Sequence, residues 1–432
     1  MSNLYFDGSR FDPLALAADI HDGLAVGPDG SWWAYSGGVW SAAPDEVRRR
    51  VVNALGSRYK TQYVPQTEDI VMHGFGTPEI PASPVGDSEW SPRINLLNGM
   101  YNWITGTLSP HDPAALSTIQ FPLRFDPEAT DTPVFDKWLA QVAPGEVGQL
   151  ALEMLGYSLM LGNPLQQAFL LLGEAGTGKS TFLRLIEAML GEGNYSAVDI
   201  QTLAANRFAA ASLYGKVANI SADLSEAYLE DTGMFKRITG GDTIVGERKY
   251  AHAFEFRPFA VPMFSANKVW RSADTSEGYF RRWVVLPFNE VVYRPDTGVV
   301  EHFDEAALQA EAPGIFLKAM DALRGVRERH GFSIAGAARE AKDRFRQASD
   351  TVYGWLAQDP AVDADKGHEG LLTARAEVYA RYQLWTEAQG MRPLSAPRFY
   401  ESLEGRGYHA KRLKTGRFIL GIQLLPEMSE AL

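Results

Sequence analysis

The 432-residue chain contains no cysteine, which excludes disulfides and thiolate zinc sites, zinc-ribbon modules among them. Its eight histidines are scattered and form no H-E-x-x-H pattern, so we expect no structural metal. No apolar run reaches the roughly 18–20 residues that a membrane helix needs. The N-terminus lacks the basic and apolar regions of a signal peptide. We therefore expect a soluble, cytoplasmic protein without a membrane partner.

The sequence also lacks low-complexity tracts and internal repeats of about 20–50 residues. Its net charge of −12 argues against a surface uniformly coated with nucleic acid, although a local basic patch or channel is compatible with that charge. The length and a hydrophobic content of 45% are typical of a globular protein with two or three domains.

The strongest positive signal is the segment Gly173–Ser180, which matches the phosphate loop G-x-x-x-x-G-K-[ST] at every fixed position. The apolar run 168–172 before it predicts a strand, and the spacing of apolar residues over 181–190 predicts a helix that stops at Gly191. Glycines let consecutive N–H groups turn toward a phosphate, and the helix N-terminus adds partial positive charge. A glycine-rich turn without a ligand is the alternative.

This motif predicts ATP and Mg²⁺ as cofactors. We expect Lys179 to reach the β- and γ-phosphates and the Ser180 hydroxyl to hold Mg²⁺. The predicted nucleotide-binding residues are Gly173, Glu174, Ala175, Gly176, Thr177, Gly178, Lys179, Ser180 and Thr181.

An NTP hydrolase also needs an acidic group for Mg²⁺ and water, and the segment 216–226 offers two candidates. Asp223 ends a predicted strand that we expect to lie next to the phosphate-loop strand, which favours Asp223 as the residue that orients metal and water. Glu226 is the second candidate, in the first turn of a following helix. A helix N-cap is the structural alternative for Asp223.

Other polar residues lie at the ends of predicted strands. Asn267 follows a strand and is a candidate for holding the attacking water or the γ-phosphate, with a simple turn asparagine as the alternative. Arg281 and Arg282 precede a strand, where an arginine can reach a neighbouring subunit's γ-phosphate, although arginines at strand starts are common. Two strands predicted over 240–254 carry basic and aromatic residues near their tip that suit DNA phosphates, namely Arg248, Lys249, Tyr250 and His252.

Strand-like runs alternate with helices between residues 145 and 330, which predicts an α/β fold with a mainly parallel sheet. The runs are 169–172, 217–221, 260–265 and 284–287. Around this ATPase domain (145–330) the sequence predicts a small mixed α/β region over 1–92, a segment over 93–144, a linker helix within 331–351 and a winged-helix-like domain over 352–432. Within the segment we expect two short strands around 98–99 and a short helix over 133–142, and the last domain should end in a strand over 418–425.

Two regions outside the ATPase domain bear on contact with DNA. The tryptophans around the predicted hairpin 31–41 could stack on bases, but tryptophans of this kind more often belong to the core. The basic run Arg48–Arg50 more simply forms a solvated helix face. Residues 373–417 carry nine Lys/Arg against four Glu, a net charge of +5 in a chain whose remainder carries −17. This island suits a nucleic-acid footprint, with a partner-docking surface as the alternative.

Taken in order, these segments resemble the superfamily 3 helicases, specifically the helicase part of the phage, plasmid and poxvirus primase-helicase family. The resemblance covers most of the chain, and the ordered set is far more specific than the phosphate loop alone. The similar segments are Ile94–Gly99, Phe121–Pro127, Leu155–Tyr157, the phosphate loop, Asp223, Lys236–Asp242, Arg248–Tyr250, Phe264–Asn267 and Phe280–Trp283, together with the winged-helix-like tail.

The resemblance implies an AAA+-like core and a homohexameric ring with ATP sites between subunits, translocating on single-stranded or forked DNA. It implies that Arg282 is the arginine finger with Arg281 close behind, that Asn267 is the sensor asparagine, and that 248–252 grips DNA. Relatives often carry paired acids where this chain has Ala222 before Asp223. The segment before the helicase is too short for a full primase domain, so a separate primase or polymerase is the expected partner.

The sequence therefore predicts an ATP-dependent replicative DNA helicase of a phage or mobile element. An origin-binding initiator, whose ATPase serves assembly on DNA without processive unwinding, is the alternative, with the basic unit 352–427 as its duplex reader. A small-molecule kinase would share the phosphate loop but would leave the basic hairpin and the C-terminal domain unexplained.

Overall fold

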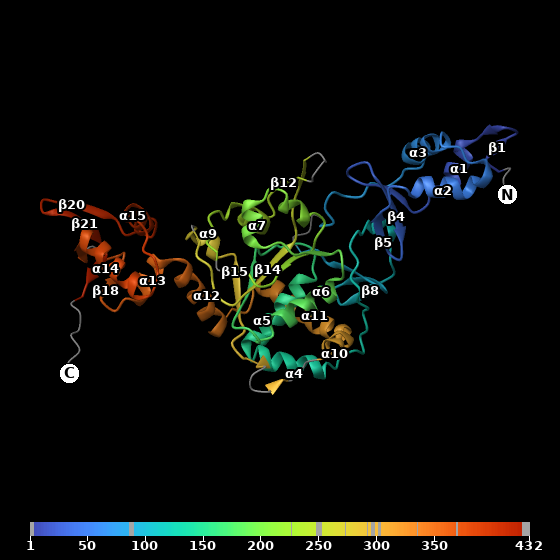
Figure 1. Ribbon diagram of the computed structural model, residues 1–432. Coiled ribbons are helices and arrows are strands. Elements are labelled where there is room, and N and C mark those ends of the chain that lie inside the picture. Colours follow the sequence, from blue (N-terminus) through green and yellow to red (C-terminus); the bar gives the residue numbers. More distant parts are fainter. Residues whose placement is uncertain are drawn as a thin grey trace.

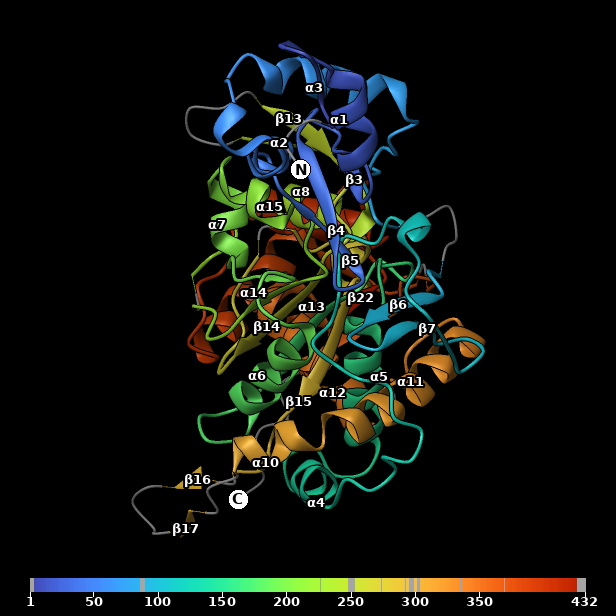
Figure 2. The same cartoon turned by 90° about the vertical axis from the view of Figure 1, so that its right-hand side faces the viewer.

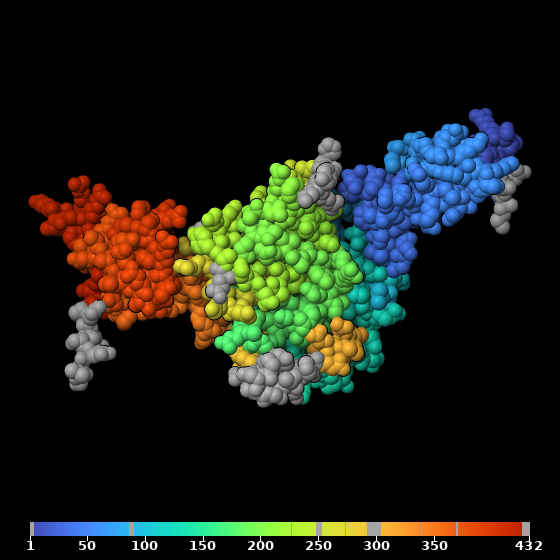
Figure 3. Space-filling model, in the orientation of Figure 1, coloured from blue at the N-terminus to red at the C-terminus, as the bar shows by residue number. Residues whose placement is uncertain are grey.

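The computed structural model describes residues 4–85, 90–225, 227–247, 253–272, 274–291, 293–294, 299–300, 304–334, 336–368 and 370–425. Three bodies follow one another along the chain, and the N-terminal and C-terminal bodies lie on opposite sides of the central one (Figure 1). The space-filling view shows the C-terminal body protruding from the central body (Figure 3).

The N-terminal body packs three helices beside a three-stranded antiparallel sheet. The predicted hairpin is confirmed, and Trp32 and Trp40 are only 6% and 3% exposed, so they belong to the core. Arg48 and Arg49 are exposed, as predicted for a solvated helix face, whereas Arg50 is half-buried and donates to the backbone oxygens of Ile20 and Asp22. The elements are β1 (Phe6–Asp7), β2 (Arg10–Phe11), α1 (Pro13–Ile20), β3 (Leu24–Val26), β4 (Trp32–Ser36), β5 (Val39–Ala42), α2 (Glu46–Leu55) and α3 (Tyr63–Gly74).

The segment before the phosphate loop forms a second antiparallel sheet and two helices. Three strands are present where the sequence predicted two: β6 (Arg93–Leu96), β7 (Gly99–Asn102) and β8 (Thr107–Ser109). Helix α4 (Pro133–Val142) has the predicted bounds, and α5 (Glu146–Ser158) leads toward the phosphate-loop strand.

The central body is built on a five-stranded sheet with the order β10-β11-β14-β9-β15, and every pair in it is parallel. Its three central strands are nearly continuous runs of buried residues, as expected for a parallel sheet covered on both faces. The strands are β9 (Ala168–Leu172), β10 (Tyr195–Ser196), β11 (Ala218–Ser221), β14 (Val261–Ala266) and β15 (Trp283–Pro287).

One predicted neighbour relation is wrong. The strand that leads to Asp223 is β11, and it pairs with β14 rather than with the phosphate-loop strand β9. Strand β14 therefore lies between the strands that carry the loop and Asp223. Strands that follow one another along the chain need not be neighbours in a parallel sheet, because a crossover connection can pass over another strand. The sequence alone therefore does not give the order of the strands in the sheet.

Helices cover both faces of this sheet, and residues of β9 alternate between the two cores. Phe169 and Leu171 pack with residues of α5, α6 (Lys179–Leu190) and α11 (Ala312–Arg329), whereas Ala168 and Leu170 pack with residues of α8 (Gly233–Gly240), α9 (Glu277–Phe280) and α12 (Gly336–Ser349). Figure 2 shows α5, α6 and α11 together on one side of the sheet. The sheet is thus the middle of a three-layer sandwich.

The remaining elements of the central body are α7 (Ile200–Ala205), β12 (Ile244–Gly246), β13 (Phe254–Phe256), β16 (Tyr293–Arg294), β17 (Val299–Val300) and α10 (Glu305–Ala310). Strands β12 and β13 form an antiparallel pair as predicted, but β13 begins only at Phe254, the last residue of the predicted range 240–254. Residues 248–252, predicted to contact DNA, lie outside the described residues.

The C-terminal body packs three helices against a three-stranded sheet of order β19-β21-β20, with a second pair, β18-β22, beside it. The predicted final strand is divided at Gly421, whose φ of +77° interrupts the extended conformation. The elements are α13 (Thr351–Gln358), β18 (Val362–Ala364), β19 (Leu372–Ala374), α14 (Arg375–Ala388), α15 (Ala396–Gly405), β20 (Ala410–Leu413), β21 (Gly416–Leu420) and β22 (Ile422–Leu424).

Among the described residues, no helix is both long and apolar enough to cross a membrane. The same residues contain no group of three or more His, Asp or Glu side chains arranged to hold a metal ion.

Candidate nucleotide-binding site

The phosphate loop joins the carboxyl end of β9 to the first turn of α6. Gly176 and Gly178 adopt φ values of +77° and +91°, which glycine reaches without the steric cost that a side chain imposes. Gly178 is the N-cap of α6, so the free N–H groups of the first helical turn face the loop. This is the geometry in which a helix N-terminus can receive an anion.

Two loop glycines are also required by close packing. A Cβ atom on Gly173 would lie 1.9 Å from the backbone oxygen of Phe288, just after β15, and one on Gly178 would lie 2.6 Å from Val142 Cγ1 on α4. The loop is therefore held between the end of the sheet and the helix that precedes the ATPase core.

We predict that Gly178→Ala lowers the melting temperature of the nucleotide-free protein more than Gly193→Ala does. Both glycines have a φ of +91°, but the space around Gly193 is open, so only Gly178→Ala adds a clash to the backbone strain. Strain alone costs about 1–3 kcal/mol, and overpacking adds about 1–3 kcal/mol. Equal shifts in thermal unfolding would show that α4 does not confine the loop.

Lys179 lies within the loop and is 4% exposed. Its Nζ donates to the backbone oxygens of Gly173 and Glu174 at 2.7 and 2.6 Å, and to Asn267 Oδ1 at 3.1 Å. Burial lowers the pKa of Lys179, and the nearby negative charge of Asp223 opposes this change. The lysine therefore sits where the loop, the end of β14 and Asp223 meet.

Asp223 follows β11 at the same edge of the sheet. Its backbone has a φ of +55°, in the left-handed region, and its N–H donates to Ser265 Oγ at 3.2 Å, which ties the loop after β11 to strand β14. Its side chain is exposed to solvent. The next described helix begins at Gly233, so Asp223 does not act as a helix N-cap. Glu226, the second acidic candidate, lies outside the described residues.

The candidate metal ligands are the hydroxyl of Ser180 in the first turn of α6 and the carboxylate of Asp223. Mg²⁺ keeps several waters and takes one or two protein oxygens together with substrate phosphates. Two oxygen donors on neighbouring elements fit that requirement, and a larger acidic cage is not needed. The hydroxyl of the next residue, Thr181, accepts a hydrogen bond from Arg184 at 3.3 Å.

The two arginines lie at the opposite edge of the sheet. Trp283, directly after Arg282, pairs with Ala168 at the start of β9, five residues before Gly173. Arg282 comes one residue earlier, so at about 3.3 Å per residue it lies about 20 Å along the strand direction from the loop. Arg282 cannot reach the phosphate loop of its own chain.

Arg282 is held in place by its own subunit. Its Nε donates to Thr239 Oγ1 on α8 at 2.9 Å, and its Nη1 donates to the backbone oxygen of Gly278. Burial, followed by the charge of Arg281, lowers the pKa of Arg282, while Asp242 and Asp274 oppose this change. Arg281 is exposed and donates to Gln166 Oε1 at 3.4 Å.

Asp274, which no sequence motif indicates, fixes the segment in front of these arginines. Asp274 accepts hydrogen bonds from Lys236 and Thr232 at 2.8 and 2.5 Å, and its Oδ1 accepts from the Ser276 N–H at 2.9 Å. Burial alone would raise the pKa of Asp274, but the hydrogen bonds lower it to about 2. No sequence pattern links Asp274 to Lys236, because the partners are 38 positions apart.

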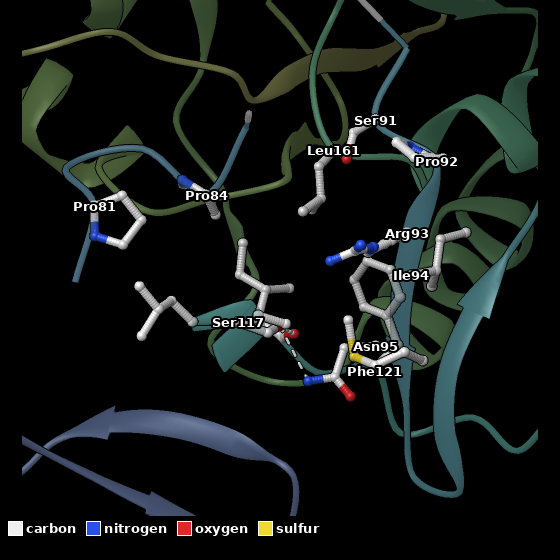
Figure 4. Close-up of a pocket in the computed structure, with 14 residues that line it drawn as sticks. Pro81, Pro84, Ser91, Pro92, Arg93, Ile94, Asn95, Ser117, Phe121 and Leu161 are labelled. Carbon is white, nitrogen blue, oxygen red and sulfur yellow. Dashed lines mark hydrogen bonds between the residues drawn. The ribbon is translucent and has the colours of Figure 1, made fainter. Parts of the chain in front are cut away.

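A pocket of about 300 Å³ lies apart from the phosphate loop, between the segment after α3 and strand β6. Figure 4 shows Pro81 and Pro84 on one side and Arg93, Ile94 and Phe121 on the other. Its lining is mostly apolar, and it contains none of the residues predicted for nucleotide binding.

Two segments of the chain match known protein families. Residues 86–144 match the family described as D5 N terminal like, and residues 171–282 match a family of unknown function, DUF5906. The second range begins in the phosphate-loop strand and ends at Arg282, so it contains both ends of the candidate site.

A segment of the chain is 25% identical over 206 residues to the protein named "Putative helicase L207/L206" of Acanthamoeba polyphaga mimivirus. The match covers 45% of this chain and 21% of that protein, so the matched segment spans about a fifth of the relative's length. The chain is similar to D5-like viral helicases. These two matches support a relation to the D5-like primase-helicase family.

Solved structures of the NrS-1 C-terminal region share the fold. One has a TM-score of 0.56 at 12% identity and covers 95% of this chain and 100% of that chain. Another has a TM-score of 0.51 at 11% identity, with 96% and 99% coverage. The similarity at this identity concerns the fold, and it extends through all three bodies.

Proposed function

We propose that this chain is an ATP-dependent replicative DNA helicase of a phage or other mobile element, acting in the host cytoplasm, with a superfamily 3 type, AAA+-like core. The observation that carries the proposal is the arrangement of the sheet. Lys179, Asn267 and Asp223 meet at its carboxyl edge, while Arg282 lies at the amino edge of the same sheet. Catalytic groups at opposite ends of the strands suit an enzyme whose sites form between subunits, because the carboxyl ends of one subunit's strands can then face the amino ends of the next subunit's strands.

ATP is the proposed substrate, with its β- and γ-phosphates on the loop and near Lys179. The Lys179 ammonium group is already confined between two loop carbonyls and Asn267, so little side-chain freedom is lost when it turns to a phosphate. When bound, Mg²⁺ would neutralise charge on the phosphates, and Ser180 and Asp223 are the oxygen donors proposed to hold it.

The roles of Asp223 and Asn267 in hydrolysis follow from their positions. Asp223 is exposed at the strand end and can accept a proton or a hydrogen bond from water, whereas the Asn267 amide can contact the γ-phosphate or that water. Ser265 ties Asp223 to β14, because its hydroxyl accepts from the Asp223 N–H, and Asn267 directly follows the end of that strand.

Arg282 is proposed to complete the site of the next subunit in a homohexameric ring. A guanidinium group that faces the transferring phosphoryl group stabilises the charge that develops there. Hydrogen bonds to α8 and α9 of its own chain hold the Arg282 side chain, so it is oriented before the ring assembles.

The proposed DNA contact in the ring is the hairpin between β12 and β13. Arg248, Lys249, Tyr250 and His252 come between these strands in the sequence, outside the described residues, and are proposed to grip one strand of single-stranded or forked DNA. Nucleotide-dependent movement of the hairpin would then draw the strand through the ring. A separate primase or polymerase is the proposed replication partner.

We expect ATP turnover by the full chain to rise several-fold when single-stranded DNA is added. The test compares turnover without DNA, with single-stranded DNA and with blunt duplex at equal nucleotide concentration. A rise with single strands only supports translocation on one strand. The same rate in all three samples would contradict the proposal.

The second candidate is an origin-binding initiator with a C-terminal winged-helix domain. The C-terminal body has the order of elements that such a domain requires, with α13, β19, α14 and α15 followed by the β20–β21 hairpin. Sequence-specific duplex binding that needs this body, without strand displacement, would favour the initiator.

A further inference from the structure

The hairpin formed by β20 and β21 carries a concentration of positive charge far from the candidate site. It protrudes at the outer end of the C-terminal body (Figures 1 and 3). Its cations are Lys411, Arg412, Lys414 and Arg417, all exposed, and the hairpin contains no acidic residue. None of the four forms an ion pair within the part of the chain that the structure describes.

Three of the other basic residues between 373 and 417 are engaged within the body. Arg381 pairs with buried Asp359 at 2.6 Å, Arg406 pairs with Asp350, and Arg375 lies 3.7 Å over the ring of Tyr400. These three stabilise the fold. Of the six remaining Lys/Arg residues of this range, four lie on the hairpin, and the other two, Arg392 and Arg398, are exposed elsewhere.

The register of the hairpin places two like charges opposite each other. Arg412 and Arg417 are direct partners in the antiparallel pair, on either side of the two-residue turn formed by Lys414 and Thr415. Like charges directly opposite on one face of a sheet are destabilising. A bound anion between or beside the two guanidinium groups would remove that repulsion.

The hairpin base is fixed to the body, so the charges are held in a defined arrangement. Ile419 is buried, and strand β21 pairs with β19 on its other side, with Ala374 opposite Phe418 and Leu372 opposite Leu420. A rigid support reduces the entropy lost when a ligand is bound.

The neighbouring helix α15 has a different charge. Its exposed residues include Glu401 and Glu404 beside Arg398. Carboxylates in this position repel DNA phosphates and do not suit a helix that enters a groove of the duplex. The hairpin thus offers cations to a DNA backbone, whereas helix α15 is not suited to reading a base sequence.

We propose that the β20–β21 hairpin binds the sugar–phosphate backbone of DNA, largely independently of base sequence. This inference rests on the proposed function, because a DNA helicase brings a polyanion to the protein. Guanidinium groups match phosphate oxygens in two parallel hydrogen bonds. The hairpin would hold the fork or the incoming duplex while the ring acts on one strand.

The test is DNA binding by the full chain carrying Arg412→Gln and Arg417→Gln. Each phosphate contact contributes about 0.9 to the slope of log affinity against log salt, which is about eightfold in affinity at 0.1 M salt. The double variant should bind forked DNA about 60-fold more weakly at that salt, with a slope smaller by about 1.8. Forks of scrambled sequence should lose affinity equally.

Arg10→Gln with Arg48→Gln is the matched control, because both arginines are exposed and lie in the N-terminal body. This control should bind DNA as the wild type does, and both double variants should keep the DNA-free rate of ATP turnover. Unchanged affinity and salt slope in the Arg412/Arg417 variant would overturn the proposal. The proposal would also be overturned if this variant bound DNA as the wild type does but formed oligomers of a different mass, since the hairpin would then contact protein.

Failure of this proposal can be separated from failure of the proposed function. Hairpin-dependent DNA binding in a protein that displaces no strand would support the hairpin proposal while removing the helicase. Strand displacement by a protein whose DNA binding does not depend on the hairpin would support the helicase and remove the hairpin proposal.

Discussion

Lys179→Ala is expected to reduce ATP turnover by at least about 10²–10³-fold, the effect of removing one preorganised group that stabilises transition-state charge. The Lys179 ammonium group is the only cation with an observed contact to both the loop carbonyls and the end of β14 among the described residues. Without it, the β- and γ-phosphates lose their positive partner inside the loop. Turnover is measured on the assembled protein at saturating ATP.

The matched control is Lys216→Ala, because Lys216 is only half-buried and the one observed contact of its Nζ is to the backbone oxygen of Gly193, outside the candidate site. This variant should turn over ATP at the wild-type rate. Thermal unfolding of both variants establishes that the loss with Lys179→Ala is not unfolding. Retention of wild-type turnover in folded Lys179→Ala would reject the loop as the hydrolytic site.

Arg282→Ala is expected to reduce turnover by about 10³–10⁵-fold while leaving nucleotide binding intact. The reason is its position at the amino edge of the sheet, where it can serve only a neighbouring subunit. Binding is followed with a fluorescent ATP analogue, and turnover is measured under the same conditions. A loss of nucleotide affinity equal to the loss of turnover would contradict a role confined to the transition state.

Mixing the two inactive variants tests the position of Arg282 directly. A subunit with Arg282→Ala has an intact loop, and a Lys179→Ala neighbour has an intact arginine, so mixed rings contain some complete sites. Mixed rings should recover part of the wild-type turnover, whereas each variant alone remains inactive. Rings made from Arg282→Ala and Arg281→Ala should stay inactive if both arginines are needed, because neither variant supplies the complete pair to its neighbour.

Sequence patterns were most informative where chemistry restricts each position. The phosphate loop needs glycine at Gly178 for its φ of +91° and for its contact with Val142, so the motif and the observed geometry have the same cause. Helix α4 was predicted at its observed bounds because its apolar residues follow the helical period and Pro133 starts it.

Strand order and contacts between distant segments could not be predicted as well from the sequence. The strand leading to Asp223 was expected next to β9, but β14 takes that place, because the order of parallel strands depends on crossover packing. Strand β10 was missed because its two residues carry no periodic signal. Lys236 and Asp274 form an ion pair although they are far apart in the sequence, and nothing in either segment identifies the partner.

The central claim is that nucleotide hydrolysis at Gly173–Ser180 drives strand separation, and displacement of one strand from a forked duplex tests it most directly. The wild-type chain with ATP and Mg²⁺ should release the labelled strand, and release should stop when Lys179→Ala replaces the wild type or ATP is omitted. Undiminished ATP turnover with no displacement from forks of either tail polarity would contradict the helicase and leave the initiator as the better account.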